Sequence, residues 1–200
     1  MAQFPNKKTY GGHMSVFWLE PTKRDVMGYK LTNVAAGVKV PQGYPLKVND
    51  ANKTAVVCKY IQIVAVASDK KTLTVRKNSL ALASEKYAKT GSDNTGTLST
   101  ISSITYGEEY DTIVLSAANN VIAAGDVMVH SSAAGTIVNA PNRVAAEYAK
   151  VDELDKTISA CHNGIVLKNI VNYPGEYLNE TTFPGSSLLV GCPLVMFITQ

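Results

Sequence analysis

The sequence predicts a mainly β protein: a compact β-sandwich or β-barrel-like domain with an extended N-terminal arm and at most one short helix. Three observations support this class. Valine, threonine and isoleucine number 22, 17 and 11 among 200 residues, and their β-branched side chains fit a strand better than a helix. Short runs of these residues end at glycine or proline, which is typical of strands joined by turns. Charged residues are only 18% of the chain, so extra surface can be buried in a core or in an assembly.

The sequence divides into an N-terminal arm, residues 1–30, and a β-rich domain, residues 31–200. Glycine and proline interrupt the arm, and no regular alternation crosses it. The arm nevertheless contains the only tryptophan, Trp18, between Phe17 and Leu19. These side chains favour burial, either on the same domain or on a neighbouring molecule. With the basic residues of the arm they give the candidate interface residues Phe17, Trp18, Leu19, Lys7 and Lys8.

The net charge of +3 hides an asymmetry between the two halves. Residues 1–100 hold 15 basic and 6 acidic side chains, and residues 101–200 hold 4 and 10. The basic residues form no dense stripe of the kind that binds nucleic acid, so no nucleic-acid partner is expected. The asymmetry suits docking on an acidic surface or the meeting of oppositely charged faces in an oligomer, and scatter over a solvated surface is the alternative.

The first strands follow the arm. Val38–Val40 alternates and precedes a predicted turn at Pro41–Gly43. Ala55–Ala67 predicts one long strand, with Tyr60, Gln62, Val64 and Val66 on one face and Ile61, Ile63, Ala65 and Ala67 on the other. Ser68–Lys71 then predicts a turn and Thr72–Arg76 the returning strand of a hairpin.

One helix is predicted, over Ser79–Lys89. Asn78 can cap its first turn, and Leu80, Ala83 and Tyr87 would share one face. Residues 91–107 are rich in serine, threonine and glycine and predict an exposed loop. The remaining predicted strands are Thr112–Leu115, Asp126–His130, Gly164–Leu167, Leu188–Val190 and Pro193–Ile198.

Catalytic motifs were sought, and one coincidence was found. Ser68–Lys71 fits S-x-x-K, Ser92–Asn94 reads SDN and Lys89–Gly91 reads KTG, which are three motifs of serine β-lactamases. That mechanism needs the serine and lysine one helical turn apart, but Ser68–Lys71 is a predicted turn between strands. The KTG and SDN triplets are also adjacent in sequence, so they cannot face each other across a substrate. We therefore expect no catalytic residue and no small-molecule substrate.

Cysteine and histidine spacing predicts no metal site and no cofactor. No C-x-x-C pair occurs, and the histidines are scattered. The cysteines stand beside apolar residues and are predicted to be buried free thiols. The sequence begins with no apolar secretory segment, and its longest charge-free apolar run, Leu188–Thr199, is too short to span a membrane, so a soluble chain without a membrane partner is expected.

Two short stretches resemble a known family. They are Ala124–Val129, followed by Ala134-Gly135, and Thr182–Gly185, which runs into an apolar closing strand. Over about residues 30–200 the chain resembles the head fiber and capsid decoration proteins of tailed bacteriophages. The resemblance implies a β domain, often a homotrimer, bound to the outside of a capsid shell, with no catalytic residues to carry over.

The expected function is therefore that of a virion structural protein, made in the host cytoplasm and acting through protein–protein contacts. Its expected partners are the major capsid protein or another virion protein, and further copies of itself. Two alternatives remain open. One is a tail or connector subunit of a virion, which a ring closed by sheet augmentation would favour. The other is a cell-surface binding β domain unrelated to virions.

Overall fold

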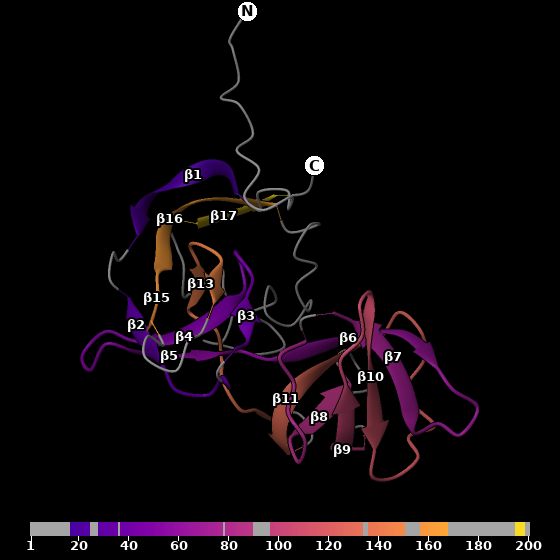
Figure 1. The fold of residues 1–200 in the computed structure, drawn as a ribbon. Coiled ribbons are helices and arrows are strands. Elements are labelled where there is room, and N and C mark those ends of the chain that lie inside the picture. The colour runs from indigo at the N-terminus through magenta and orange to yellow at the C-terminus, as the bar shows by residue number, and fades with distance from the viewer. Residues whose placement is uncertain are drawn as a thin grey trace, which may run out of the picture.

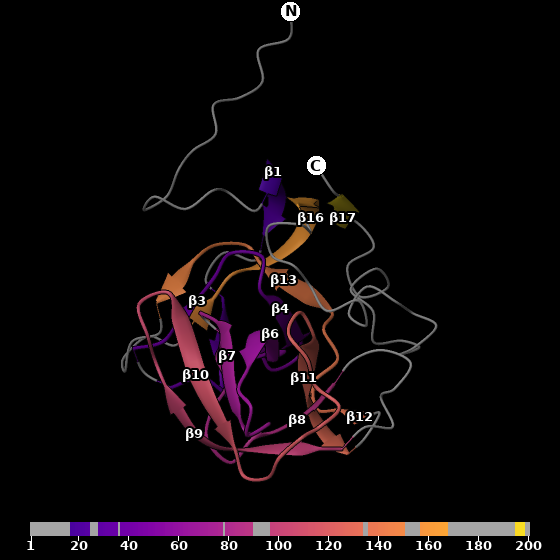
Figure 2. The same cartoon turned by 90° about the vertical axis from the view of Figure 1, so that its right-hand side faces the viewer.

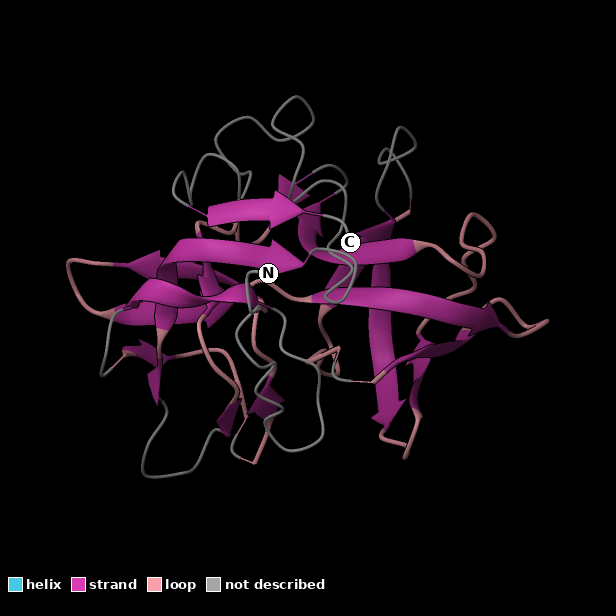
Figure 3. Cartoon of the chain, turned by 90° about the horizontal axis from the view of Figure 1, so that it is seen from above, coloured by secondary structure: helices cyan, strands magenta, loops and turns pink. Residues whose placement is uncertain are grey.

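A computed structural model describes residues 17–24, 28–35, 37–77, 79–89, 97–133, 136–150, 157–167 and 195–198. All the regular elements in these ranges are strands, as Figure 3 shows. The predicted mainly β, barrel-like fold is confirmed.

The strands form two units, and one is inserted into the other (Figure 1). The chain builds β1, β2, β4 and β5 of a first sheet, leaves it to build β6 to β12, and returns to the first sheet with β13. We call the first sheet the terminal sheet, because it contains the first and last described strands, and the inserted unit the barrel.

The terminal sheet has eight strands in the order β1-β16-β13-β4-β5-β2-β15, with β17 also paired to β16. Its pairs are antiparallel except β2 with β5 and β16 with β17. A separate two-stranded sheet joins β3 to β14. The strands are β1 (Phe17–Arg24), β2 (Tyr29–Leu31), β3 (Lys39–Val40), β4 (Pro45–Asn49), β5 (Thr54–Val57), β13 (Arg143–Ala145), β14 (Ala149–Lys150), β15 (Thr157–Ile158), β16 (Ala160–Leu167) and β17 (Val195–Ile198).

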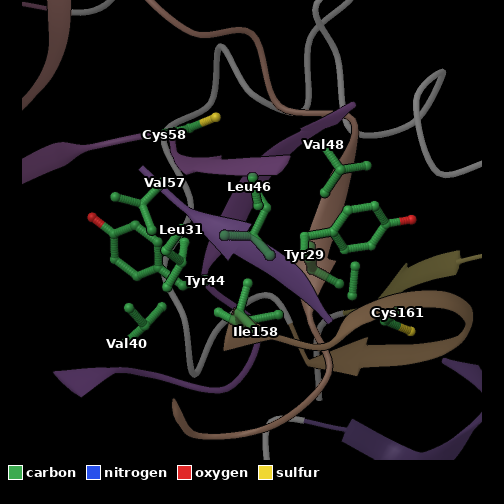
Figure 4. Packing of buried hydrophobic residues seen from close by; sticks show 14 of the residues in the cluster. Tyr29, Leu31, Val40, Tyr44, Leu46, Val48, Val57, Cys58, Ile158 and Cys161 are labelled. Carbon is green, nitrogen blue, oxygen red and sulfur yellow. The ribbon is translucent and has the colours of Figure 1, made fainter. Parts of the chain in front are cut away.

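The terminal sheet curls back on itself at Ser159. This residue separates β15, which pairs with β2, from β16, which pairs with β13. β15 and β16 stand at opposite ends of the strand order β16-β13-β4-β5-β2-β15, yet only Ser159 separates them in sequence. The two ends of the sheet are therefore close together. Its inner face holds a core of valine, leucine, tyrosine and isoleucine side chains, among them Tyr29, Leu46, Val57 and Ile158 (Figure 4).

The barrel is a closed antiparallel ring. Its sheet runs β12-β11-β6-β7-β10-β9-β8, and an additional pairing of β11 with β8 closes the ring. Because of this closure each ring strand has a paired neighbour on both sides, so the ring has no edge strand. Figure 2 shows the ring strands below β1, β16 and β17 of the terminal sheet. They are β6 (Tyr60–Val66), β7 (Thr72–Arg76), β8 (Lys86–Lys89), β9 (Ser99–Thr105), β10 (Tyr110–Leu115) and β11 (Val127–Ala133), with β12 (Thr136–Ile137) as a short addition to β11.

A second core fills the barrel. Alternate residues point inward, as in β10, where Asp111, Ile113 and Leu115 are buried. The core comprises Ile61, Ile63, Leu73, Val75, Ala81, Tyr87, Ile101, Ile113, Leu115, Ile122 and Met128. Each unit thus has its own hydrophobic core.

Three predicted elements need correction. The single strand Ala55–Ala67 is broken at Cys58 and Lys59, because β5 and β6 belong to different sheets. The helix Ser79–Lys89 is wrong: its backbone reverses at Leu80 and Ser84, which have φ of 55° and 69°, and then extends into β8.

The loop predicted over 91–107 is wrong for Ser99–Thr105, which is β9. Ile101, only 1% exposed, anchors that strand in the barrel core. The turns at Pro41–Gly43 and Ser68–Lys71 and the strand Thr72–Arg76 are confirmed. Gly43, at φ 77°, adopts a backbone conformation that favours glycine.

The expected boundary between arm and domain falls inside β2, since Lys30 is its middle residue. The segment Phe17–Arg24 is β1, paired with β16 of its own sheet. The backbone of this part of the arm thus follows the alternative in which the segment packs on its own domain. Tyr29, fully buried, belongs to the core of the terminal sheet.

Candidate functional site

The first candidate site is the edge of the terminal sheet at β1. This strand pairs with β16 on one side, from Phe17 opposite Val166 to Arg24 opposite Cys161, with three register irregularities. It ends the strand order, so no described strand pairs with its other side. At eight residues, β1 is longer than the other described strands with a free side, which have two to four residues. An open edge of this length offers unpaired backbone groups to another chain.

The last described strand adjoins the same place. β17 runs parallel to β16, from Val195 opposite Gly164 to Ile198 opposite Leu167. Its Met196 is 61% exposed. Strands from both ends of the chain therefore flank β16, at the end of the molecule away from β8 and β9 in both Figure 1 and Figure 2.

The predicted interface residues fall in two groups. Phe17, Trp18 and Leu19 open β1, on the free edge of the sheet. Lys7 and Lys8 lie outside the described residues. That these five residues form an interface stays a prediction, and the pairing of β1 with β16 could not be read from the sequence.

The second candidate site is the junction between the two units. Tyr44 of the terminal sheet unit stacks on Tyr60 of the barrel, with ring centroids 5.3 Å apart at 22°. The Tyr44 hydroxyl donates to the carbonyl oxygen of Ser79 at 3.2 Å. Tyr60, Leu80 and Val129 come from the barrel segment yet belong to the core of the terminal sheet. The two units are therefore packed against each other through apolar and aromatic contacts.

A buried polar group lies beside this junction, and we call Lys59, Glu85, Tyr87 and His130 the neck cluster. Lys59 is in the two-residue crossing between β5 and β6 and is 1% exposed. Its Nζ lies 2.5 Å from Glu85 Oε1. The other carboxylate oxygen accepts from the Tyr87 hydroxyl at 2.9 Å and from the Leu82 backbone N–H at 2.8 Å. The ion pair is thus fully embedded in hydrogen bonds, which burial of charge requires.

His130 completes the neck cluster from β11. It is opposite Tyr87 in the β11–β8 pair, and the two rings lie 5.4 Å apart at 30°. Its backbone N–H donates to the Lys59 carbonyl oxygen at 3.1 Å. The Nδ1 atom is enclosed and has no hydrogen-bond partner among the described residues. Burial lowers the pKa of His130 from its usual 6.5; the Glu85 carboxylate opposes this shift and the Lys59 cation adds to it.

The thiols and phenols near the junction are held neutral. Burial raises the pKa of the Cys58 thiol and of the Tyr60 hydroxyl. Burial, aided by neighbouring Tyr60, raises the pKa of Tyr44 well above 10.0. In the terminal sheet, burial raises the pKa of Cys161 to about 11. Cys58 and Cys161 are buried and free, as predicted, and Cys192 lies outside the described residues.

The motifs weighed in the sequence are placed as follows. Ser68–Lys71 is the turn of the β6–β7 hairpin, where the Asp69 carboxylate accepts from the backbone N–H groups of Lys71 and Thr72, both at 2.9 Å. Ser92–Asn94 lies outside the described residues. The part of the chain that the structure describes holds no group of three or more histidine, cysteine or acidic side chains that could bind a metal ion. That same part includes no helix long and apolar enough to cross a membrane.

Comparisons with known proteins give no relative: no family model matches the chain, and neither the curated proteins nor the solved structures that were searched contain a match.

Sequence reasoning missed the neck cluster. Its one signal was Lys59, a cation inside the apolar stretch Ala55–Ala67. A charged residue inside an apolar stretch lies either in an exposed turn or in a buried ion pair. The sequence could not distinguish the two, because the partner Glu85 is 26 residues away. The cluster forms because the crossing between the two units brings Lys59 against the barrel.

Proposed function

We propose that this protein is a virion structural protein, a capsid decoration or head fiber protein that binds the outside of a phage capsid shell. The observation that carries the proposal is the edge strand β1, which is eight residues long, begins Phe17-Trp18-Leu19, and has one side that pairs with no described strand, whereas the ring of the barrel is closed. A free edge with apolar residues can add to another subunit's sheet. The closed ring of the barrel has no edge strand to pair with another subunit, so we expect the barrel to lie outside the interface.

The arrangement of the two units supports attachment at one end. β1 and β17 flank β16 at the end of the molecule away from β8 and β9. A partner bound at β1 would leave the far end of the barrel exposed, as on a shell-bound decoration protein. Exposed Met196 on β17 adds apolar surface at the same end.

The expected partners are the major capsid protein and two further copies of this chain, which together give a homotrimer. A tryptophan at the centre of an interface contributes about 2–4 kcal/mol, whereas charges at a rim contribute mainly to the rate of encounter. We therefore expect Trp18 to carry more of the association energy than Lys7 or Lys8.

The role is tested in two steps. Mass spectrometry of purified particles should find the chain in a fixed ratio to the major capsid protein, and the purified protein should bind preformed shells. Trp18→Ala should weaken shell binding at least tenfold, and Lys7→Ala should leave it within about twofold at moderate salt. A chain absent from particles, or a Trp18→Ala variant that binds as tightly as the parent, would contradict the proposal.

A truncation gives an independent check, and the fold fixes where to cut. Tyr29 is fully buried in the core of the terminal sheet, so removal of residues 1–30 would open that core. The cut is better placed after Arg24, which removes residues 1–24 and, of the described strands, only β1. We expect the remaining protein to fold and to lose shell binding. A truncated protein that is less stable yet assembles normally would show that β1 serves only its own sheet.

A further inference from the structure

We propose that the neck cluster is an acid-sensitive latch, which holds the junction between the barrel and the terminal sheet at neutral pH and loosens when His130 is protonated. This inference goes beyond the proposed function and does not depend on it. It starts from the position of the cluster. Lys59 lies in the crossing between β5 and β6, so a change beside Lys59 acts where the two units are joined.

The charges in the cluster are balanced only while His130 is neutral. Lys59 contributes one positive charge and Glu85 one negative charge, 2.5 Å apart. Around His130, Lys59 comes from the crossing, Glu85 and Tyr87 from the β8 side, and β12 contributes Thr136 and Ile137, neither of which titrates. A proton on His130 would place a second cation beside Lys59 with one carboxylate between them.

The geometry also gives that proton no acceptor. Nδ1 of His130 is enclosed and has no hydrogen-bond partner among the described residues. A protonated ring donates from both nitrogens, and a buried donor without a partner is costly. Among the described residues no acceptor faces Nδ1, so the protonated ring would gain a partner by moving toward water. Such a movement would pull on the His130 N–H, which donates to the Lys59 carbonyl oxygen, and would loosen the crossing.

The sign of the pH dependence follows from the lowered pKa of His130. An unfolded or opened chain takes up the proton near pH 6.5, above the pKa of the half-buried ring. The stabilisation is therefore complete above pH 6.5 and is lost as the pH falls through and below that value. The predicted loosening occurs on mild acidification, before the carboxylates titrate near pH 4.

Hydrogen exchange of the full chain at pH 7.5 and pH 5.5, corrected for intrinsic rates, tests the latch. Peptides that cover Cys58–Ile61 should exchange severalfold faster at the lower pH, with about tenfold as the upper limit for one proton taken up near pH 6.5, while peptides from β7 and β10 should change less than about twofold. His130→Gln stays neutral and should abolish the increase, whereas His162→Gln, a histidine change in β16, should retain it. Equal exchange at both pH values, or an undiminished increase in His130→Gln, would overturn the proposal.

The unaltered protein gives a second measurement if His130→Gln fails to fold. With ¹³C-labelled histidine, the His130 resonance should titrate with a midpoint below 6.5. The backbone amide resonances of Cys58 and Lys59 should shift with the same midpoint. Neck amides that do not follow the His130 titration would equally overturn the latch.

Discussion

Removal of the buried cation Lys59 is the sharpest test of how the two units are held together. Its Nζ is 2.5 Å from Glu85 Oε1, and the two side chains are 1% and 17% exposed. Lys59→Met keeps most of the aliphatic volume and leaves the Glu85 carboxylate without its counter-ion. Breaking a buried pair in this way costs about 3–5 kcal/mol. Glu85 keeps its bonds from the Leu82 N–H and the Tyr87 hydroxyl, so we expect a value near the lower limit, about 3 kcal/mol.

Urea denaturation at pH 7.5, followed by circular dichroism, measures this loss. Lys86→Met, at an exposed position of β8, is the matched control and should change the free energy of unfolding by less than about 0.5 kcal/mol. The double variant Lys59→Met/Glu85→Gln should recover part of the loss, because a neutral amide replaces the unpaired carboxylate. If Lys59→Met stays within about 1 kcal/mol of the parent, the pair does not stabilise the junction and the reasoning fails.

Three further predictions concern other parts of the fold. The Asn142 side chain continues the pairing of β13 with β4, because it accepts from the Val48 N–H at 2.8 Å and donates to the Val48 carbonyl at 3.1 Å. Asn142→Ala should lower the free energy of unfolding, measured by urea denaturation, by about 2–3 kcal/mol. An unchanged midpoint would refute this role. A Cβ at Gly107 would come within 2.1 Å of the Tyr110 carbonyl oxygen, so Gly107→Ala should lower the thermal midpoint measurably; a variant as stable as the parent would show that the β9–β10 turn can relax. With its pKa raised from 9.0 to about 11, native Cys161 should react with iodoacetamide at pH 8 about 100-fold more slowly than in urea. Equal alkylation rates in the two states, read by peptide mass spectrometry, would contradict the burial of this thiol.

The fold class was predictable because a strand leaves a local signal in the sequence: many β-branched residues, and buried and exposed positions that alternate along the chain. Thr72–Arg76, with Leu73 and Val75 buried, shows this directly. The same alternation could not reveal where a strand leaves one sheet for another. Ala55–Ala67 is a nearly continuous apolar run, yet Cys58 and Lys59 form the crossing between the two units, because sheet membership is decided by distant pairing partners.

The predicted helix failed because its pattern was compatible with two structures. Leu80, Ala83 and Tyr87 are spaced for one helix face, but Ala83 is exposed while Tyr87 is fully buried in the barrel. The strand Lys86–Lys89 pairs with both β9 and β11, and this long-range pairing outweighs helix propensity. Closure of the ring requires that strand.

The candidate interface was partly predictable for a related reason. The apolar triplet Phe17-Trp18-Leu19 stands out in a segment broken by glycine and proline. That the triplet lies on an open edge depends on the pairing of β1 with β16, which is contributed by residues far along the chain. The neck cluster was not predicted, because Lys59, the segment with Glu85 and Tyr87, and His130 are separated in sequence and meet only in the folded chain.

The most direct test of the proposed function is a cryo-electron microscopy reconstruction of the native particle that contains this protein. The account predicts density for the chain on the outer surface of the shell, with the free edge of β1 about 5 Å from a strand of a neighbouring subunit, the normal spacing of paired strands. The barrel should point away from the shell. A reconstruction in which the free edge of β1 faces solvent, while another surface makes the contact, would contradict the central claim.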